Sequence, residues 1–414
     1  MAPKFWANRP ISSSMKILIN AVSAKSGGAA SYIQNLAKEL SVVNENDEYV
    51  FFVPFGQANQ IHQVGQNMRV VSTDVGSTSS WKRFLWDQII LRRIVKKEKV
   101  DILLSSSDFG MLYPPCRQVL MVRNPLFFSN FYLETILPLK SLAVRLEFRM
   151  RRWLIVLSVK SSDIVITASH SMLSDVRRFI SIPNGGAAVN RFGVPLEKFN
   201  EGWDNAKRQG AKEADRLQQK SLRMLYVSEY SDHKNFTTLL RAVLLLRERG
   251  VDGFCLTTTA DPDQFPDVEI SSRAADRALS SDARISPYIK FVGSVSYEYI
   301  HMLYHENDLF VFPSLAESFG HPLVEAMASG LPIIASDIPI HREICGEAAL
   351  YFSPLDPQDL VSKILILSDN VQLREHLGKT GRARAATQFS WKEHVQRQIV
   401  ILKELANKDL KSRA

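Results

Sequence analysis

Residues 317–330 read ESFGHPLVEAMASG, between two apolar runs that read DLFVFPS at 308–314 and LPIIAS at 331–336. The flanking runs have the length and composition of buried strands, and the segment between them contains a short helical pattern that ends at a glycine. Glu317 is therefore expected on a loop at the carboxyl end of a strand, and Glu325 in the early turns of the next helix. In an open α/β sheet, this edge is where ligands bind.

The two glutamates can accept hydrogen bonds from a ligand rich in hydroxyl groups, such as a sugar or a ribose. Gly320 allows the backbone to approach a ligand closely, and the helix start offers free N–H groups to hydroxyls or phosphate. The spacing alone carries little weight, because glutamates at this separation are common on helix surfaces. The alternative interpretation is a solvated helix face beside a turn.

Short apolar runs alternate with amphipathic helical patterns along the chain, which is typical of βαβ units and parallel sheets. In the first half, strands are predicted at 16–22, 49–54, 68–72, 101–105, 118–122, 163–168 and 187–193, and helices around 31–41, 82–99, 139–160 and 170–180. In the second half, strands are predicted at 223–228, 253–259, 289–292, 308–312, 332–336 and 349–352, and helices at 235–249, 296–305, 321–329, 356–368 and 370–387. A last helix is predicted from Ser390 to about Leu405. The two series indicate two α/β domains.

The chain has 414 residues, a comfortable length for two domains, and the composition of a soluble globular protein. Cys116, Cys255 and Cys345 form neither a disulfide framework nor a zinc pattern, which fits a reducing compartment. No stretch is apolar enough to span a bilayer, and residues 1–14 lack the apolar core of a secretory signal. We therefore expect a cytoplasmic or peripheral protein, with 1–14 as a disordered extension and Met15 as a candidate natural start.

The charge is unevenly distributed between the two halves. Residues 1–200 hold 25 Lys and Arg against 14 Asp and Glu, a net charge of +11, whereas 201–414 hold 26 against 29, a net charge of −3. A basic first half suggests an anionic partner for that half.

The segment 308–354 resembles the E-x7-E signature of the retaining glycosyltransferases of family 4, also described as glycosyl transferases group 1. The resemblance rests on the Phe-Pro-Ser run before Glu317, on the Ser-Phe-Gly run beside it, and on the Glu-Ala-Met-Ala-Ser-Gly-Leu-Pro run that begins at Glu325. It extends less specifically from Lys16 to Leu405. It implies the GT-B fold, an α/β architecture in which two Rossmann-like parallel-sheet domains face each other across a cleft.

By that resemblance, residues 15–199 form an N-terminal acceptor domain and residues 222–394 form a C-terminal domain for the nucleotide sugar. Residues 200–221 are polar and are expected to be a linker or a short exposed helix. The last helix is expected to cross back, so that 395–414 pack on the N-terminal domain.

A glycine-rich turn, SAKSGGAASY at 23–32, connects the first predicted strand to the first helix. Backbone amides and the helix dipole can make such a turn an anion site. It is neither a G-x-G-x-x-G pattern nor a P-loop, so its residues leave two alternatives, a phosphate loop and an ordinary tight turn. The resemblance implies that Gly27 and Gly28 reach the donor diphosphate across the cleft.

The second domain opens with LYVSEYSDHKNF at 225–236. This segment is similar to the family's Gly-Arg-Leu…Glu-Lys-Asn segment, whose Arg and Lys bind the leaving diphosphate. Lys234 and Asn235 match the Lys and Asn of that segment, which implies a catalytic role for Lys234 and a substrate-binding role for Asn235. The alternative for Lys234 is a solvated lysine at the start of a helix. Ser228 and Glu229 stand where the family has Gly and Arg. Because a carboxylate facing a diphosphate is repulsive, Glu229 is expected to turn away or to pair with a cation.

Two further loops are similar to parts of the family's donor site. The run IKFVGSV at 289–295 resembles the strand and loop that border the nucleotide base, where backbone groups near Gly293 are expected to read the base edge. In the first domain, many relatives have a histidine that contacts the donor sugar. Arg123 and Asn124 stand there in this chain, either as sugar or phosphate contacts or as a structural turn.

The resemblance implies a retaining transfer of a hexose from a UDP- or GDP-sugar to a saccharide or lipid-linked acceptor, as in the synthesis of cell-surface polysaccharides. Glu317 is expected to hold the donor-sugar hydroxyls and Glu325 the ribose hydroxyls. The donor loop that assists them comprises Ser318, Phe319, Gly320, His321, Pro322 and Leu323. We expect no metal ion and no cofactor beyond the nucleotide-sugar co-substrate, because Lys234 and helix N-termini take the place of a cation.

Two alternative functions stay open. A nucleotide-sugar epimerase can use the same two-domain fold, and a catalytically impaired relative that still binds the nucleotide sugar would explain the carboxylate at Glu229. His170 and His341 have no partner pattern and are expected to be capping or surface histidines.

Residues 139–160 form a basic amphipathic pattern with leucines, valines and Trp153. The cations in it are Lys140, Arg145, Arg149, Arg151, Arg152 and Lys160, against Glu147 alone. Such a helix can lie on an anionic membrane surface, which would place the protein at the inner face of the membrane. The alternative is a Rossmann helix with solvated cations. No nucleic-acid partner is indicated.

Overall fold

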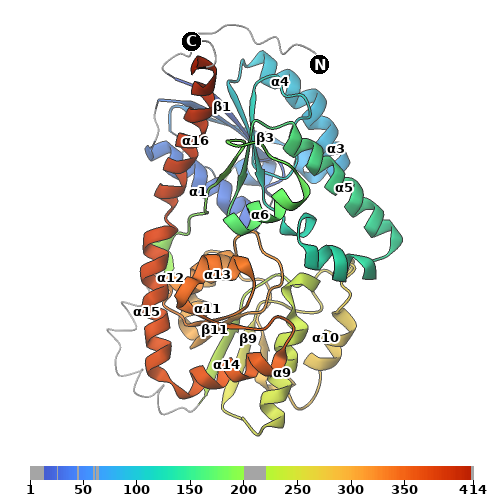
Figure 1. Ribbon diagram of the computed structural model, residues 1–414, viewed down its shortest axis with the longest axis vertical. Helices are drawn as coiled ribbons and strands as arrows, with labels where there is room; N and C mark the ends of the chain where they lie inside the picture. The colour runs from blue at the N-terminus through green and yellow to red at the C-terminus, as the bar shows by residue number, and fades with distance from the viewer. Residues whose placement is uncertain are drawn as a thin grey trace.

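The structure, a computed structural model, describes residues 14–25, 27–43, 46–58, 61, 65–199 and 221–411. The predicted extension 1–14 and the predicted linker 200–221 lie outside these residues, apart from Ser14 and Ser221. The described residues form two α/β domains, each with its own parallel sheet, stacked along the long axis of the molecule (Figure 1). The predicted fold class, two Rossmann-like domains, is confirmed.

The N-terminal domain contains seven parallel strands in the order β3-β2-β1-β4-β5-β6-β7. Their bounds are Lys16–Asn20 for β1, Glu48–Pro54 for β2, Met68–Thr73 for β3, Ile102–Ser105 for β4, Arg117–Val122 for β5, Ile164–Thr167 for β6 and Ala187–Val189 for β7. Each of these strands overlaps a predicted strand.

The C-terminal domain contains six parallel strands in the order β10-β9-β8-β11-β12-β13. Their bounds are Leu222–Tyr226 for β8, Phe254–Thr258 for β9, Ile289–Phe291 for β10, Leu309–Phe312 for β11, Ile333–Ser336 for β12 and Ala349–Phe352 for β13. In β11 and β12 every residue is buried, because helices cover both faces of a parallel sheet.

The helices alternate with the strands. In the first domain they are α1 Gly27–Val43, α2 Phe55–Ala58, α3 Ser80–Trp86, α4 Arg92–Lys97, α5 Leu142–Lys160 and α6 His170–Phe179. After β8 they are α9 Phe236–Glu248, α10 Arg273–Ser280, α11 Ile300–Glu306, α12 His321–Ala328, α13 Pro339–Cys345, α14 Pro357–Asp369, α15 Val371–Gln388 and α16 Trp391–Lys411. The sequence patterns did not indicate α2, α10 or α13. The helix predicted at 82–99 is interrupted by a π-helical turn at Asp87–Leu91.

The strand order of each sheet reverses once, between β1 and β4 in the first and between β8 and β11 in the second. At such a point the following segments leave in opposite directions and open a crevice at the carboxyl ends of the strands. The loops at these ends meet across the domains, since the Ser169 hydroxyl donates a hydrogen bond to the Ser318 carbonyl at 2.8 Å. The two crevices therefore lie on facing edges of the two sheets.

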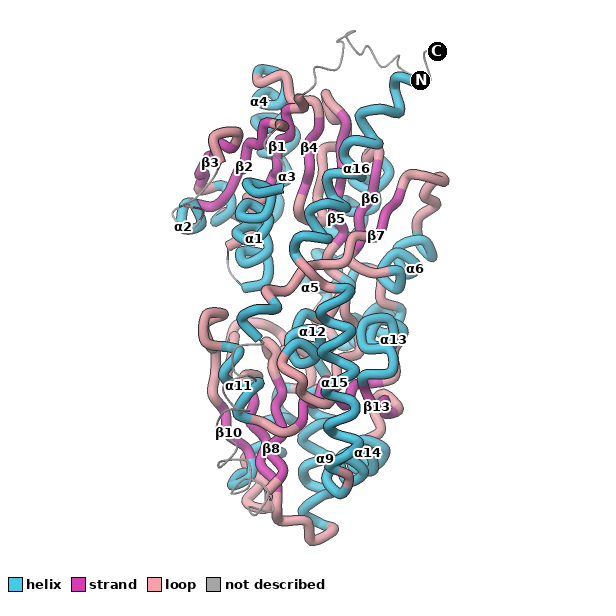
Figure 2. Tube along the Cα trace, turned by 90° about the vertical axis from the view of Figure 1, so that its left-hand side faces the viewer, coloured by secondary structure: helices cyan, strands magenta, loops and turns pink. Residues whose placement is uncertain are grey.

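The last helix joins the two domains. In Figure 1 the chain leaves the lower domain through α15, and α16 runs up beside α1 of the upper domain. The Tyr32 hydroxyl of α1 lies 3.1 Å from Nε2 of His394, and Asn190 Nδ2 donates to the Gln398 side chain at 3.2 Å. Figure 2 shows the same helix against the upper sheet from the side. Among the described helices, none is both long and apolar enough to cross a membrane.

Candidate active site

The loops after β8 and β11 bring Lys234 and Glu317 together. Lys234 ends the 3₁₀ turn Asp232–Lys234, and its ammonium forms an ion pair with the Glu317 carboxylate. The Ser314 hydroxyl donates to the same oxygen, Glu317 Oε1, at 2.8 Å. Because β8 and β11 are neighbours in the sheet, two segments 83 positions apart in sequence meet at one edge.

Electrostatics favour the ionised form of Glu317. Burial alone would raise the pKa of Glu317, but the charge of Lys234 and the hydrogen bonds from Lys234 and Ser314 outweigh it, and the pKa of Glu317 falls below its ordinary value. Burial and the neighbouring ammonium lower the pKa of His233 to about 3, so this imidazole is neutral at physiological pH. The site therefore holds one cation and one carboxylate that offset each other.

Asn235 holds the loop that carries Lys234. Its backbone has a φ of 55°, in the left-handed region that asparagine tolerates better than most residues. Its side-chain nitrogen donates to the Pro313 carbonyl at 3.1 Å, and its oxygen accepts from Thr238 at 2.7 Å. Both ends of the amide thus bond to the protein, which positions Lys234 beside Glu317.

Glu325 lies in an environment very different from that of Glu317. It is only 4 % exposed, and its Oε2 accepts a hydrogen bond from the Tyr304 hydroxyl at 2.8 Å. Burial raises the pKa of Glu325 to about 7, although hydrogen bonds from Tyr304 and Tyr297 and the charge of Lys198 oppose the rise. The spacing of the two glutamates therefore places one carboxylate in an ion pair and the other beside two tyrosines, of which Tyr304 is buried.

The start of α12 carries the donor loop. Gly320 has a φ of 83°, which favours glycine, and a Cβ there would lie 3.1 Å from the Leu323 side chain. Phe319 is fully buried below the loop, with its ring 5.4 Å from that of Phe192 in the first domain. The ring of His321 stacks on Phe192 at 5.2 Å. Aromatic contacts between the domains thus position the start of the helix.

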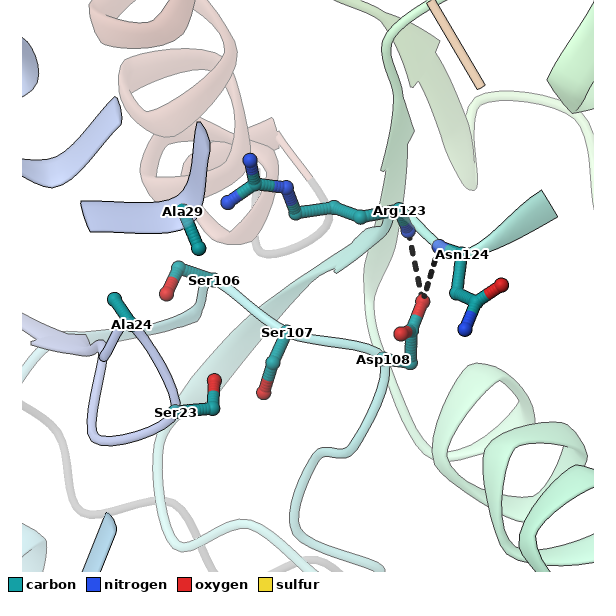
Figure 3. Close-up of a pocket in the computed structure, with 8 residues that line it drawn as sticks. All are labelled: Ser23, Ala24, Ala29, Ser106, Ser107, Asp108, Arg123 and Asn124. Atoms are coloured by element: carbon teal, nitrogen blue, oxygen red, sulfur yellow. Dashed lines mark hydrogen bonds between the residues drawn. The ribbon is translucent and has the colours of Figure 1, made fainter. Parts of the chain in front are cut away.

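A cavity of about 240 Å³ opens at the carboxyl ends of β1, β4 and β5 (Figure 3). It is lined by Ser23, Ala24, Ala29, Ser106, Ser107, Asp108, Arg123 and Asn124. Asp108 Oδ1 accepts hydrogen bonds from the backbone N–H groups of Arg123 and Asn124, at 2.8 and 3.0 Å. Sequence reasoning missed Asp108 and the serines, although the Ser-Ser-Ser-Asp run after the strand predicted at 101–105 could have indicated them.

Arg123 and Asn124 contribute to this cavity differently. The Arg123 guanidinium lies over the rings of Tyr32 and Phe192, with its Cζ 4.7 and 5.1 Å from their centroids. Asn124 Oδ1 accepts a hydrogen bond from the backbone of Leu126 at 3.0 Å and caps the short turn that follows. The Asn124 side chain therefore stabilises the backbone of its own loop, whereas the Arg123 side chain lies between two aromatic rings.

Three glycines are candidates for contact with the donor, two at the start of α1 and one in the loop after β10. Gly27 begins α1, and a Cβ at Gly28 would meet no atom within 4 Å. Gly293 has a φ of 64° and is equally open. Glu229 is exposed. Its backbone carbonyl accepts a hydrogen bond from the Ser228 hydroxyl at 2.9 Å.

His341 corrects a prediction, since it is fully buried rather than on the surface or capping a helix end. Its Nδ1 lies 2.9 Å from the Ser336 carbonyl, and burial lowers the pKa of its imidazole to about 4. The Ser336 hydroxyl donates in turn to the Ser314 carbonyl, so His341 supports the loop that holds Glu317. His170 is exposed, as predicted.

Further polar contacts join the domains around the site. Glu343 of α13 accepts the backbone N–H groups of His170 and Ser171, at 2.9 and 2.8 Å, and thereby caps α6 from the other domain. On another loop, Lys140 forms an ion pair with Asp232 at 2.6 Å. Lys140 belongs to the basic pattern predicted at 139–160, but it is buried in this contact rather than available to a membrane.

Comparisons with known proteins agree with this architecture. The family described as Glycosyltransferase Family 4 matches residues 26–198, and the family described as Glycosyl transferases group 1 matches residues 207–384. The chain belongs to glycosyltransferase family 4, with the GT-B fold.

Curated relatives match over part of their length. An O-antigen chain mannosyltransferase, RfbU, of Salmonella typhimurium is 39% identical over 20% of this chain and 24% of its own length. An MMP α-(1→4)-mannosyltransferase of Mycolicibacterium hassiacum is 33% identical over 42% of this chain and 40% of its own length. The matched segments thus span less than half of each of these two relatives.

Solved structures match over nearly the whole chain. A sucrose-phosphate synthase from Thermosynechococcus elongatus has a TM-score of 0.72 at 19% identity, covering 94% of this chain and 99% of that chain. HepE from Anabaena in complex with UDP and glucose has a TM-score of 0.65 at 17% identity, covering 94% of this chain and 99% of that chain. These likenesses concern the fold.

Proposed function

We propose that this chain is a hexosyltransferase that moves a hexose from a UDP- or GDP-sugar to a hydroxyl of a saccharide or lipid-linked acceptor. The observation that carries the proposal is the Lys234–Glu317 ion pair at the carboxyl ends of β8 and β11, opposite a cavity lined with hydroxyls in the other domain. The mannosyltransferase relatives and the UDP-bound neighbour support the donor class.

In this proposal, Lys234 and the N–H groups at the start of α12 bind the diphosphate, and Glu317 and the donor loop bind the sugar hydroxyls. Glu325, beside Tyr304, binds the ribose. Transfer proceeds with retention of configuration and without a metal ion or other cofactor, because the ammonium and the helix dipole stabilise the charge on the leaving phosphate. Gly27 and Gly28 approach the diphosphate from the first domain, Asn235 places Lys234, and Gly293 lies near the base.

The first experiment is a thermal-shift screen of the full chain with UDP-, GDP- and ADP-sugars. A bound donor raises the melting temperature by mass action, so the correct nucleotide is identified without knowledge of the acceptor. A chain that no nucleoside diphosphate or its sugar stabilises would contradict the proposal.

Product analysis then separates the three functions that a donor-binding chain could have. A transferase forms a new glycoside only when an acceptor is added. An isomerised nucleotide sugar formed without acceptor would indicate an epimerase, and donor binding without any product would indicate an impaired relative.

We also propose that the N-terminal domain contacts an anionic membrane at the inner face of a cell. In α5, Leu142, Leu146 and Trp153 are exposed among cations, and Trp81 and Leu85 of α3 are exposed as well. The two helices lie on the same side of the upper domain in Figure 1. Exposed apolar side chains flanked by Lys and Arg suit the interface of an anionic bilayer.

A further inference from the structure

The donor site in the second domain is short of positive charge. The loop after β8 has an exposed carboxylate at Glu229, at the position where the resemblance to the family implies an arginine. The Lys234 ammonium is already paired with Glu317. A diphosphate bound beside this pair would carry negative charge on both phosphates, and the side chains of this loop would offset only part of it.

A guanidinium without an ionic partner lies on the other side of the site. Among the described residues, no carboxylate forms an ion pair with the Arg123 side chain. Oδ1 of Asp108, on the adjacent loop, is engaged by two backbone N–H groups. The Arg123 side chain extends past Ser106 toward Ala29 in the first turn of α1, away from Asp108 (Figure 3). The charge of Asp108 acts on the guanidinium from a distance, but no described side chain forms a hydrogen bond or an ion pair with it. A partly buried cation of this kind is costly, so we take a bound anion as the partner that it lacks.

The surroundings of Arg123 place it between the two helix starts of the site. Its guanidinium lies over Tyr32 of α1 on one side and over Phe192 on the other. Phe192 in turn stacks on His321, the first residue of α12. Because Arg123 and His321 both lie against the Phe192 ring, the two side chains are close to each other. Burial lowers the pKa of His321 to about 3, and the charges of Arg123 and Lys234 lower it further. The two cations therefore approach the start of α12 from opposite domains.

We infer that Arg123 supplies, from the N-terminal domain, the second positive charge for the donor diphosphate that the C-terminal domain lacks at Glu229. This inference rests on the proposed function. In the transfer, the bond between the sugar C1 and the phosphate oxygen breaks and its electrons stay on that oxygen. The acceptor oxygen bonds to C1, and its proton passes to the leaving phosphate. Arg123 stabilises the charge that develops on this phosphate before the proton arrives.

One consequence is that charge compensation needs both domains. Lys234 belongs to the second domain and Arg123 to the first, and the aromatic contact between Phe192 and His321 holds the two sides together. A donor bound to the second domain alone would lack the second cation until the domains meet. This coupling would favour bond cleavage only in the closed site.

The test uses the full chain with Arg123→Met and the nucleoside diphosphate found in the thermal-shift screen. The affinity for the diphosphate is expected to fall about 10-fold, and kcat to fall about 10²-fold, on the scale of losing one oxyanion donor. The affinity for the nucleoside without phosphates is expected to stay unchanged. Arg123→Lys, which keeps the charge but not the planar fork, is expected to lose less than Arg123→Met.

A second variant tests whether a positive charge in the other domain can replace that of Arg123. Glu229→Arg in the Arg123→Met chain restores the arginine at the family's position and is expected to recover at least about 10-fold of the lost diphosphate affinity. The matched control is Glu375→Arg in the Arg123→Met chain, which makes the same charge change at an exposed position of α15 and is expected to recover nothing.

Three results would overturn the inference while leaving the proposed function intact. The first is an unchanged diphosphate affinity and kcat in Arg123→Met. The second is a raised KM for the acceptor with unchanged diphosphate affinity, which would assign Arg123 to an anionic acceptor. The third is loss of the folded state in Arg123→Met, which would assign the guanidinium a structural role. A wild-type chain that binds no nucleoside diphosphate would instead contradict the proposed function itself.

Discussion

The two crevices of this molecule are built on the same topology but filled differently. At the β8/β11 crevice, the charged groups satisfy one another, because Lys234, Ser314 and Glu317 form one bonded cluster. At the β1/β4 crevice, a cavity remains, with serine hydroxyls, Asp108 and the unpaired Arg123 around it. The β8/β11 crevice is thus organised before any ligand binds, whereas the β1/β4 crevice has polar groups left for a ligand to satisfy.

This difference also explains why the β8/β11 crevice could be recognised from a sequence motif and the β1/β4 cavity could not. A cluster that bonds within itself needs particular residues at particular positions, so it leaves a motif in the sequence. A cavity whose groups await a ligand varies with that ligand. We therefore expect changes at the first crevice to alter donor binding and turnover, and changes at the second to alter acceptor binding, with Arg123 as the link between them.

The largest effect is expected from Lys234→Met. This change removes the cation from the diphosphate and leaves Glu317 without its partner, so kcat is expected to fall about 10²–10³-fold. Steady-state kinetics with saturating donor measure the loss, and Lys234→Arg serves as the control that keeps the charge. Equal turnover in Lys234→Met and the wild type would show that the β8/β11 crevice does not catalyse the transfer.

The next effect concerns stability and pH at Glu325. The pKa of this carboxyl is about 7 in the folded protein against an ordinary value of 4.5, so the folded state binds its proton more tightly than the unfolded chain. The resulting stability is fully present below about pH 4.5 and is lost as the pH rises through about 7, which corresponds to roughly 3 kcal/mol.

Glu325→Gln should remove this dependence, since the amide keeps an acceptor for Tyr304 but does not titrate. Urea unfolding at about pH 5 and about pH 8 measures it, with the wild type expected to lose more stability than the variant. A parallel pH dependence in the two proteins would contradict the buried state of this carboxyl. Glu325→Ala is a poorer probe of ribose binding, because it leaves the buried Tyr304 hydroxyl without its partner at a cost of roughly 1–3 kcal/mol.

A moderate effect is expected from Asp108→Asn at the other crevice. The amide oxygen can still accept the backbone N–H groups of Arg123 and Asn124, so the loop should keep its shape. The lost charge would weaken a hydrogen bond from an acceptor hydroxyl, and we expect the KM for the acceptor to rise about 10-fold with the donor affinity unchanged. If only the donor affinity changed, the Asp108 cavity would bind the donor rather than the acceptor, and the proposed division of roles between the two crevices would be wrong.

The smallest effect is expected at the surface of α5. Arg149 is exposed there, and Arg149→Glu should weaken binding to phosphatidylglycerol vesicles about 5-fold or more, with the difference shrinking at high salt. Co-sedimentation measures it, with phosphatidylcholine vesicles as the uncharged reference. Arg241→Glu on α9 of the other domain is the matched control, because Arg241 is also exposed. Equal loss in both variants would indicate a nonspecific charge effect.

Much of the fold could be predicted from apolar runs, because parallel strands must be buried on both faces and leave a simple pattern. Every predicted strand has a counterpart in the structure, and only short helices such as α10 and α13 were missed. These helices span eight and seven residues, too few for a periodic pattern to stand out from a loop. The π-helical turn at Asp87–Leu91 likewise leaves no pattern of its own.

The candidate site was predictable only in part. The pairing of Glu317 with Lys234 follows from their positions after neighbouring strands, but the sequence did not show which strands would be neighbours. The burial of Glu325 and His341 depends on tyrosines and serines that come from other elements. Asp108 escaped notice because a lone carboxylate in a loop has no spacing to mark it.

Local patterns of apolar residues, glycines and glutamates were enough to predict the two parallel sheets, the family and the position of the loop at 317–323. Which charges are paired became clear from the folded arrangement. It placed Glu317 in an ion pair, buried Glu325 beside Tyr304 and left Arg123 between two rings. The physical reason is that a charge is set by its neighbours within a few ångströms, and here those neighbours come from strands far apart in the chain.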